Sequence, residues 1–437
     1  MSNSENVNDG NLPRRSFLAR AAAAIVGLEL ESKASVHQSS AKTYEFLHGQ
    51  WFDGHRFQNS KFYSVGRVLT TKKPASIDHV FDLAGKYVVP PFGDAHNHSL
   101  SGPFNVDSMT RQYLNDGIFY VKNPAHIARD TNLIKDKINK PTSVDVIFAN
   151  GPLTASGGHP VEMYDKGASL SKAKTPGPDG TFENLGYYIV DNESDLQKKW
   201  PMIIADGSDF IKTELLYSEE FEKRRDDPSY RGYKGLDPKL LRSIVAKAHE
   251  NNLRVSCHIE TATDFRNALT AGVDEIAHMP GYYPDFSPRA NLSWFPITKE
   301  DAALAARKKV DVVTTTYVSQ AELKKPDELK QARAIQAGNL RLLHQAGVKL
   351  AIGPDVYGVT SLAETMNLYD LKVFDDLTLL KMWCEATPEV IFPNRKIGHL
   401  KEGYECSFLV LSGDPIQAFA NVQKIEMRIK QGEILST

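Results

Sequence analysis

Cysteine is scarce in this chain, which has Cys257, Cys384 and Cys406 among its 437 residues. An odd number of cysteines scattered over a long chain does not imply a disulfide framework. Cys257 stands directly before His258, a candidate metal ligand, but we expect it to be a small core residue on the opposite face of a strand rather than a nucleophile. The sequence therefore predicts a fold held together by its core, not by disulfides.

Long apolar runs and dense blocks of positive charge are also missing. No stretch has the roughly 20 apolar residues that a membrane-spanning helix needs. The formal net charge is -2, so the sequence has no electrostatic footprint for nucleic acid. With 41% hydrophobic residues, the chain can form one large domain and a smaller partner domain. We expect a globular protein whose partner is a small molecule or a short peptide, with a homo-oligomeric state left open.

The first 40 residues differ in character from the rest. Arg14 and Arg15 precede a mildly apolar, alanine-rich run over residues 19–30, which is typical of a twin-arginine export signal. This pattern predicts a periplasmic or secreted protein. Because Arg20 and Glu29 interrupt the run, a cytoplasmic protein with a disordered leader is the alternative.

The remaining sequence changes pattern twice. Residues 41–89 contain short, aromatic-rich alternating segments, whereas residues 90–392 alternate apolar strands with amphipathic helices, as parallel βα units do. Eight parallel strands close a (β/α)8 TIM barrel, which is the α/β fold that we predict for this region. Residues 393–437 return to short strands and are expected to complete a small β-sandwich domain with residues 41–89. The predicted barrel strands are 117–121, 144–149, 209–214, 254–259, 275–278, 310–317 and 349–353, with one more strand that delivers His96.

Metal-competent side chains follow the predicted barrel strands. His96 and His98 are two residues apart, so in an extended segment they point to the same side and can bind one divalent ion such as zinc. Reacting groups of a parallel barrel lie at the C-terminal ends of its strands. Four further side chains fall at such ends and are expected to converge with the two histidines: Lys212, His258, His278 and Asp355.

Taken together, these motifs resemble those of the amidohydrolase superfamily. The matching segments are P-x-x-D-x-H-x-H at 91–98, GSDFIK at 207–212, CHIE around His258, IAHMP around His278 and IGPD ending at Asp355. The likeness extends over the chain after about residue 44. It implies two divalent metal ions, most simply zinc, with a carboxylated Lys212 bridging them. By this resemblance His96, His98, Lys212 and Asp355 would bind one metal, and Lys212, His258 and His278 the second.

The resemblance further implies a metal-dependent hydrolase of a C–N bond in an amide, peptide or cyclic amide. Two metals about 4 Å apart would activate a hydroxide, while Asp355 would pass a proton to the leaving amine. The alternative is a site with one zinc or iron ion and an unmodified Lys212. Its ligands would be His96, His98, Asp355 and either His258 or His278. Such a site fits a mononuclear deaminase. A non-catalytic secreted metalloprotein is a third hypothesis, although such a protein would not need Asp355 as a proton shuttle.

His159 is a further candidate. The segment Ser156–His159 resembles the Gly-Gly-His element of the prolidase-like and imidazolonepropionase-like branch, in which His159 would polarise or anchor a substrate carbonyl. The alternative is a loop histidine beside two turn glycines. Residues 118–124 and 405–409 depart from the usual family patterns, so the substrate of no subfamily is carried over to this chain.

Two long segments follow the third and fourth predicted strands, at residues 160–206 and 217–236. Loops of this length in a compact barrel are usually lids or specificity elements. The second contains Arg224, Arg225 and Arg231, which could recognise a carboxylate, whereas a solvated charged loop is the competing interpretation.

Overall fold

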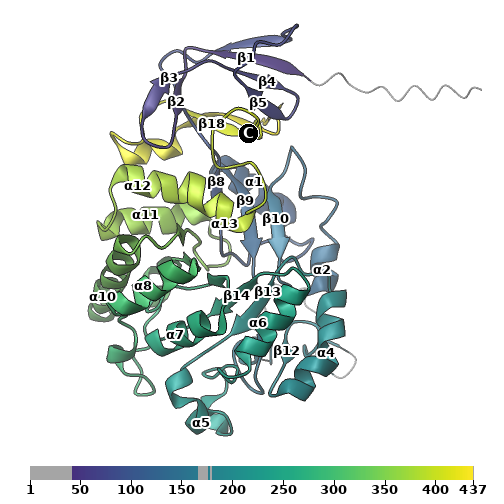
Figure 1. Cartoon of the computed structure of the whole chain (residues 1–437), viewed down its shortest axis with the longest axis vertical. Helices are drawn as coiled ribbons and strands as arrows, with labels where there is room; N and C mark the ends of the chain where they lie inside the picture. The colour runs from purple at the N-terminus through teal and green to yellow at the C-terminus, as the bar shows by residue number, and fades with distance from the viewer. Residues whose placement is uncertain (1–41, 166–175, 178–179, 437) are drawn as a thin grey trace, which may run out of the picture. The chain divides into compact units, whose positions relative to one another are not determined.

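The structure is a computed structural model that describes residues 42–165, 176–177 and 180–436 (Figure 1). The export signal predicted within the first 40 residues lies outside the described residues. Within the described part of the chain, no helix has the length and apolar character required to cross a membrane.

Strands from both ends of the chain build two sheets, one of four strands in the order β5-β4-β1-β6 and one of six in the order β20-β19-β18-β7-β2-β3. Buried side chains from both sheets, such as Phe46, Trp51 and Phe408, form one hydrophobic cluster. The C-terminal strands thus complete a sheet begun near residue 50, while the domain boundaries drawn from the sequence stay predictions. The strands are β1 Thr43–Leu47, β2 Gln50–Phe52, β3 Phe57–Asn59, β4 Phe62–Val65, β5 Val68–Thr70, β6 His79–Asp82, β7 Tyr87–Val89, β18 Phe408–Leu411, β19 Ile425–Lys430 and β20 Glu433–Ile434.

The middle of the chain forms parallel sheets, one in the order β10-β9-β8 and one in the order β12-β11-β13-β14-β15-β16-β17. All strand pairs in these two sheets are parallel. The α/β class is therefore confirmed. The strands are β8 Phe92–Asp94, β9 Ile118–Asn123, β10 Asp145–Phe148, β11 Leu153–Thr154, β12 Tyr188–Ile189, β13 Ile211–Glu214, β14 Val255–His258, β15 Glu275–Ile276, β16 Asp311–Val313 and β17 Leu350–Ala351.

Two separate strands flank the proline pair that precedes His96. The apolar run Tyr87–Val89, which the sequence analysis places in the β-sandwich part of the chain, is β7 and pairs with β18 and β2 in the six-stranded sheet. Pro90 and Pro91 have no N–H group to donate to a ladder, so the pairing ends there. A separate short strand, β8, follows the prolines and pairs with β9. Strands β11 and β12 were not predicted from the sequence.

Helices connect the parallel strands and cover them (Figure 1). α7 begins with a capping box between Thr261 and Asp264. The Asp264 carboxylate also accepts hydrogen bonds from the N–H groups of Tyr217 at 2.9 Å and Ser218 at 2.8 Å, which fixes the segment after β13. The helices are α1 Val106–Asn115, α2 Ala128–Asn132, α3 Val161–Asp165, α4 Glu193–Ala205, α5 Phe221–Arg224, α6 Leu241–Glu250, α7 Ala262–Ala271, α8 Lys299–Lys308, α9 Tyr317–Glu322, α10 Pro326–Gln345, α11 Ser361–Leu371, α12 Asp376–Lys381 and α13 Thr387–Ile391.

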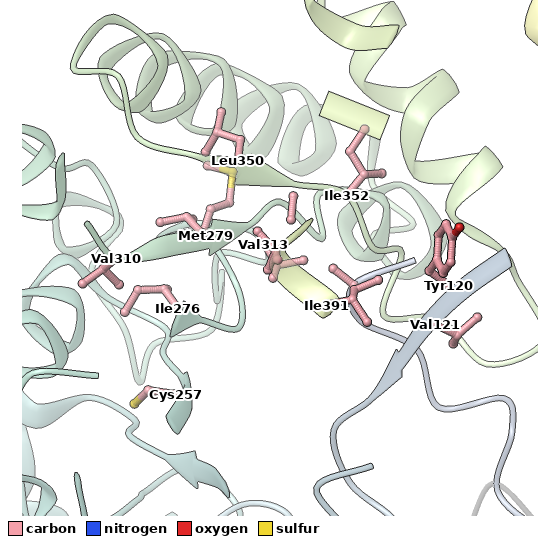
Figure 2. Close-up of a cluster of buried hydrophobic side chains, with 14 of the residues drawn as sticks. Tyr120, Val121, Cys257, Ile276, Met279, Val310, Val313, Leu350, Ile352 and Ile391 are labelled. Atoms are coloured by element: carbon pink, nitrogen blue, oxygen red, sulfur yellow. The ribbon is translucent and has the colours of Figure 1, made fainter. Parts of the chain in front are cut away.

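The core of the parallel part consists of apolar side chains from neighbouring strands. Figure 2 shows Cys257, Ile276 and Val313 among them, on β14, β15 and β16. Cys257 is fully buried and unpaired, and burial raises the pKa of its thiol to about 12. The prediction that it is a core residue is therefore confirmed.

Arg224 has a structural role in the segment after β13. Its side chain is 0% exposed, and its guanidinium lies 3.9 Å from the centre of the Tyr217 ring. It donates hydrogen bonds to the carbonyl oxygens of Tyr233 and Arg289, each at 2.8 Å. With its donors used in this way, Arg224 holds the segment in place and is not available to a substrate carboxylate.

Candidate active site

A cavity of about 430 Å³ lies at the C-terminal ends of the parallel strands. Its wall contains histidines from three strands: they follow β8, lie at the end of β14 and follow β15. The wall also contains the lysine of β13 and the aspartate that follows β17. The structure brings every sequence-predicted site residue to this wall. They are His96, His98, His159, Lys212, His258, His278 and Asp355.

His96, His98 and Asp355 form one side of the cavity. Asp355 Oδ1 lies 3.3 Å from His96 Nε2 and 3.0 Å from His98 Nε2. His96 Nδ1 is 3.0 Å from the carbonyl oxygen of Ala277, which can only accept, so the Nδ1–H donates and Nε2 keeps its lone pair toward the cavity. Asp355 has a φ of 51°, a left-handed conformation that a non-glycine residue adopts rarely and mostly where the surrounding structure enforces it.

His278 lies between the two sides of the cavity. Its ring centre is 4.3 Å from that of His96 and 4.6 Å from that of His258. Its Nδ1 is 3.5 Å from Asp355 Oδ2 and 3.2 Å from the hydroxyl of Thr315. Thr315 has a φ of 47°, which is uncommon for a β-branched residue, and in this conformation its hydroxyl reaches the imidazole.

The other side of the cavity centres on Glu214. Its Oε2 lies 3.4 Å from His258 Nδ1, and its Oε1 lies 3.5 Å from Lys212 Nζ. The ring of His159 stacks on that of His258, with centres 4.9 Å apart. His159 therefore faces the potential ligands directly, and its predicted contact with a substrate carbonyl stays a prediction.

Burial sets the charge states of these groups. Loss of hydration lowers the pKa of His96, His258 and His278 well below the usual range, and lowers that of His159 to about 3. Burial also raises the pKa of Glu214 to about 7. Four neutral imidazoles at neutral pH offer lone pairs, which is the state that divalent metals bind.

The residues present fit a divalent metal ion. Nitrogen and carboxylate oxygen are the ligands that zinc accepts, and within each of two groups the donor atoms all lie within 4.8 Å of one another. Two deeply buried atoms, His96 Nε2 and Glu214 Oε2, have no hydrogen-bond partner among the described residues, as expected of atoms placed to bind an ion. The two groups are His96, His98 and Asp355, and His159, Glu214 and His258.

Sequence reasoning missed two carboxylates of this site. Glu214 follows Lys212 by two residues in β13, and side chains two apart in a strand share a face, so the spacing could have identified it. Glu260 follows His258 by two residues, and its Oε1 lies 3.2 Å from His258 Nε2. The hydroxyl of Tyr282 donates to the same oxygen at 3.2 Å. The motif GSDFIK ends at Lys212, before Glu214, and the motif CHIE contains Glu260 but was used only for its histidine.

Parallel strands that present histidines, a lysine and an aspartate to one cavity agree with an amidohydrolase-type fold. No family model matches the chain. The chain is similar to the ochratoxinase of Aspergillus niger, with 24% identity over 282 residues that cover 58% of this chain and 55% of that protein. The chain thus spans about half the length of the curated relatives it matches.

Several solved structures share the fold. The crystal structure of A. niger ochratoxinase has a TM-score of 0.69 at 18% identity and covers 90% of this chain and 96% of its own. A prolidase complexed with N-methylphosphonate-L-proline has a TM-score of 0.67 at 17% identity, and the match covers 90% of this chain and 100% of the prolidase chain. Molinate hydrolase has a TM-score of 0.63 at 14% identity, and the match covers 91% of this chain and 95% of the molinate hydrolase chain. These neighbours show the fold that the chain shares with them, and the curated relative adds a likeness in sequence.

Proposed function

We propose that this protein is a metal-dependent hydrolase that cleaves a C–N bond in an amide, a peptide or a cyclic amide. The observation that carries the proposal is the convergence of five imidazoles, Lys212 and Asp355 on one cavity. The names of the relatives, which include an ochratoxinase, a prolidase and a molinate hydrolase, favour C–N bond hydrolysis over the mononuclear deaminase.

The proposal includes a closed (β/α)8 barrel made of β8, β9, β10 and β13 to β17, joined to a small β-sandwich. Hydrogen bonds between the two parallel sheets support closure. The Ala95 N–H donates to the carbonyl of Ile352 at 2.8 Å, and the Asp209 N–H donates to that of Phe148 at 2.8 Å. These contacts link the segment after β8 to that after β17, and β10 to the segment before β13. Both edges of the three-stranded sheet would then be joined to the seven-stranded sheet, as a closed barrel requires, while β11 and β12 lie outside this ring of eight strands.

In this proposal His96, His98 and Asp355 would hold one divalent ion, with zinc the simplest candidate. His258 and a carboxylated Lys212 would take part in holding a second ion. His278 lies between His96 and His258. When bound, such ions lower the pKa of coordinated water and polarise a carbonyl. Lys212 is 3% exposed, and a carbamate on its Nζ would replace a buried cation by an anion with two oxygen ligands.

Asp355 would move the proton. Its side chain is 16% exposed, and it lies on the cavity wall, so water and substrate reach it. Its carboxylate would accept a proton from the attacking water and deliver it to the leaving nitrogen, which must be protonated to depart as an amine. A non-catalytic metal-binding protein could use this carboxylate as a ligand but would have no use for it as a proton carrier.

The cavity wall also indicates the kind of substrate. Besides the polar groups, it contains Met163, Tyr164, Val318, Val356 and Tyr357, while Glu322 contributes an acidic group. A volume of about 430 Å³ is in the range of small-molecule sites. We therefore propose an amide or dipeptide-sized substrate with an apolar group beside the scissile bond.

A hydrolysis screen tests this preference. Dipeptide amides with leucine or phenylalanine beside the scissile bond should be cleaved with a kcat/KM about tenfold or more above that of the aspartate analogues, because burying a carboxylate against apolar side chains is costly. Release of amine is measured by mass spectrometry with the zinc-loaded protein. Equal or faster cleavage of the aspartate series would contradict the preference, and release of ammonia from a purine or pyrimidine instead would favour the deaminase.

A further inference from the structure

We propose that Glu214 is a metal ligand which, with His258 and His159, forms the site of a second ion. This inference rests on the metal-binding part of the proposed function. It differs from the ligand set that the family resemblance implies, which contains neither Glu214 nor His159. It also gives His159 a ligand role in place of the carbonyl-anchoring role predicted from the sequence.

Glu214 is a carboxylate with an unused oxygen in a buried place. The residue is 1% exposed, and its Oε2 accepts no hydrogen bond from any described residue. A buried carboxylate oxygen without a partner is destabilising unless a cation or a proton compensates it. Lys212 lies 3.5 Å from the other oxygen, Oε1, so it leaves Oε2 free. Period-two alternation in β13 places Lys212 and Glu214 on the same face, toward the cavity.

His258 presents its Nδ1 to Glu214 Oε2, and its other ring nitrogen, Nε2, contacts a second carboxylate. Its Nε2 lies 3.2 Å from Glu260 Oε1, the oxygen that also accepts the hydroxyl hydrogen of Tyr282. Glu260 Oε1 acts as an acceptor, so the His258 Nε2–H donates to it. The other nitrogen of the neutral ring, Nδ1, then keeps a lone pair. A carboxylate that holds the far nitrogen of an imidazole is the usual support of a metal-bound histidine.

Two electron-rich atoms then face each other. His258 Nδ1 and Glu214 Oε2 are 3.4 Å apart, and without an intervening cation their lone pairs would repel. Two ligands of one tetrahedral zinc ion, with bonds of about 2.1 Å, lie about 3.4 Å apart. The ring of His159, stacked on His258 with centres 4.9 Å apart, completes a group whose donor atoms lie within 4.8 Å of one another. These three donors would join the carbamate of Lys212 proposed above in holding the second ion.

The experiment counts metal ions without any substrate. Wild type, Glu214→Gln and His159→Gln are stripped with a chelator, equilibrated with excess Zn²⁺, desalted and analysed by inductively coupled plasma mass spectrometry. The wild type should retain two ions per chain and each variant one. The dissociation constant of the weaker ion should rise about 100-fold or more in both variants, since loss of a supporting residue alone costs 10- to 100-fold.

Glu364→Gln is the matched control. Glu364 is also a fully buried glutamate whose pKa burial raises to about 7, but it accepts hydrogen bonds from Thr316 and Tyr317 and does not line the cavity. The Glu364→Gln variant should therefore retain two ions. Circular dichroism checks that each variant is folded, and His159→Gln keeps the test valid if Glu214→Gln does not fold.

Two results would overturn the inference: either variant retains two ions with wild-type affinity, or the wild type binds a single ion. Neither result depends on turnover. If the ion count falls from two to one in both variants but no amide is hydrolysed, the ligand assignment stands and the proposed function fails. If amides are hydrolysed but the ion count does not change, the ligand assignment fails and the proposed function stands.

Discussion

Replacing Asp355 by asparagine is expected to lower kcat about 1,000-fold or more. The substitution keeps the size of the side chain but removes the group that would accept and deliver the proton, and proton transfer by a positioned side chain typically contributes 10²- to 10⁴-fold. It also removes a charge that lies 3.3 Å or less from two histidine nitrogens, so the ion held there should bind more weakly. Steady-state hydrolysis at saturating zinc measures the first effect, and metal analysis the second.

Asp311→Asn provides the control for this prediction. Asp311 is paired with Arg254 at 2.7 Å and does not line the cavity, so its loss should affect stability and leave kcat within a few-fold of wild type. If Asp355→Asn keeps wild-type kcat while its metal content is unchanged, Asp355 does not transfer the proton in the reaction.

The second large effect is expected for Lys212→Ala. Four imidazoles and two divalent ions around a cationic lysine would be electrostatically unfavourable, whereas a carbamate supplies an anion and two oxygens. The variant should lose most of the second ion and nearly all activity. Added acetate or propionate should restore part of both by occupying the place of the carbamate. Metal content and amide hydrolysis are measured with and without the added acid.

Lys122→Met separates this effect from the general cost of removing a buried lysine. Lys122 contacts both carboxylate oxygens of Glu275 at 2.6 Å and does not line the cavity. Breaking a buried pair leaves one charge uncompensated, so the variant should lose about 3–5 kcal/mol of unfolding free energy in urea. It should nevertheless retain its metal content and gain nothing from acetate. A Lys212→Ala protein with full metal content and turnover would show that Lys212 is structural and would favour the one-ion hypothesis.

The sequence predicted the α/β class and the convergence of the cavity residues because both follow from regular patterns. Apolar strands alternating with amphipathic helices specify parallel βα units, and parallel strands end at the same edge, so polar residues such as His258 and Asp355 meet there. The motifs flanking them added the implied ligand roles. None of this required knowledge of long-range packing.

Other features depend on contacts that sequence patterns do not encode. The run Tyr87–Val89 is apolar enough for either sheet, and its pairing with β18 is decided by a partner more than 300 residues away. Arg224 resembles a solvent-exposed charge in the sequence, but its guanidinium is buried against Tyr217 and two carbonyl oxygens. Glu214 lies two residues beyond the end of the motif that contains Lys212, although strand alternation places both side chains on one face.

Metal removal and replacement is the most direct test of the central claim. The purified protein is stripped with a chelator, assayed on a leucine- or phenylalanine-containing dipeptide amide, and titrated with Zn²⁺ while hydrolysis and bound metal are followed in the same samples. We predict no hydrolysis by the stripped protein, and recovery of turnover that rises with the ions bound per chain. Full turnover by protein that contains no metal would contradict the account.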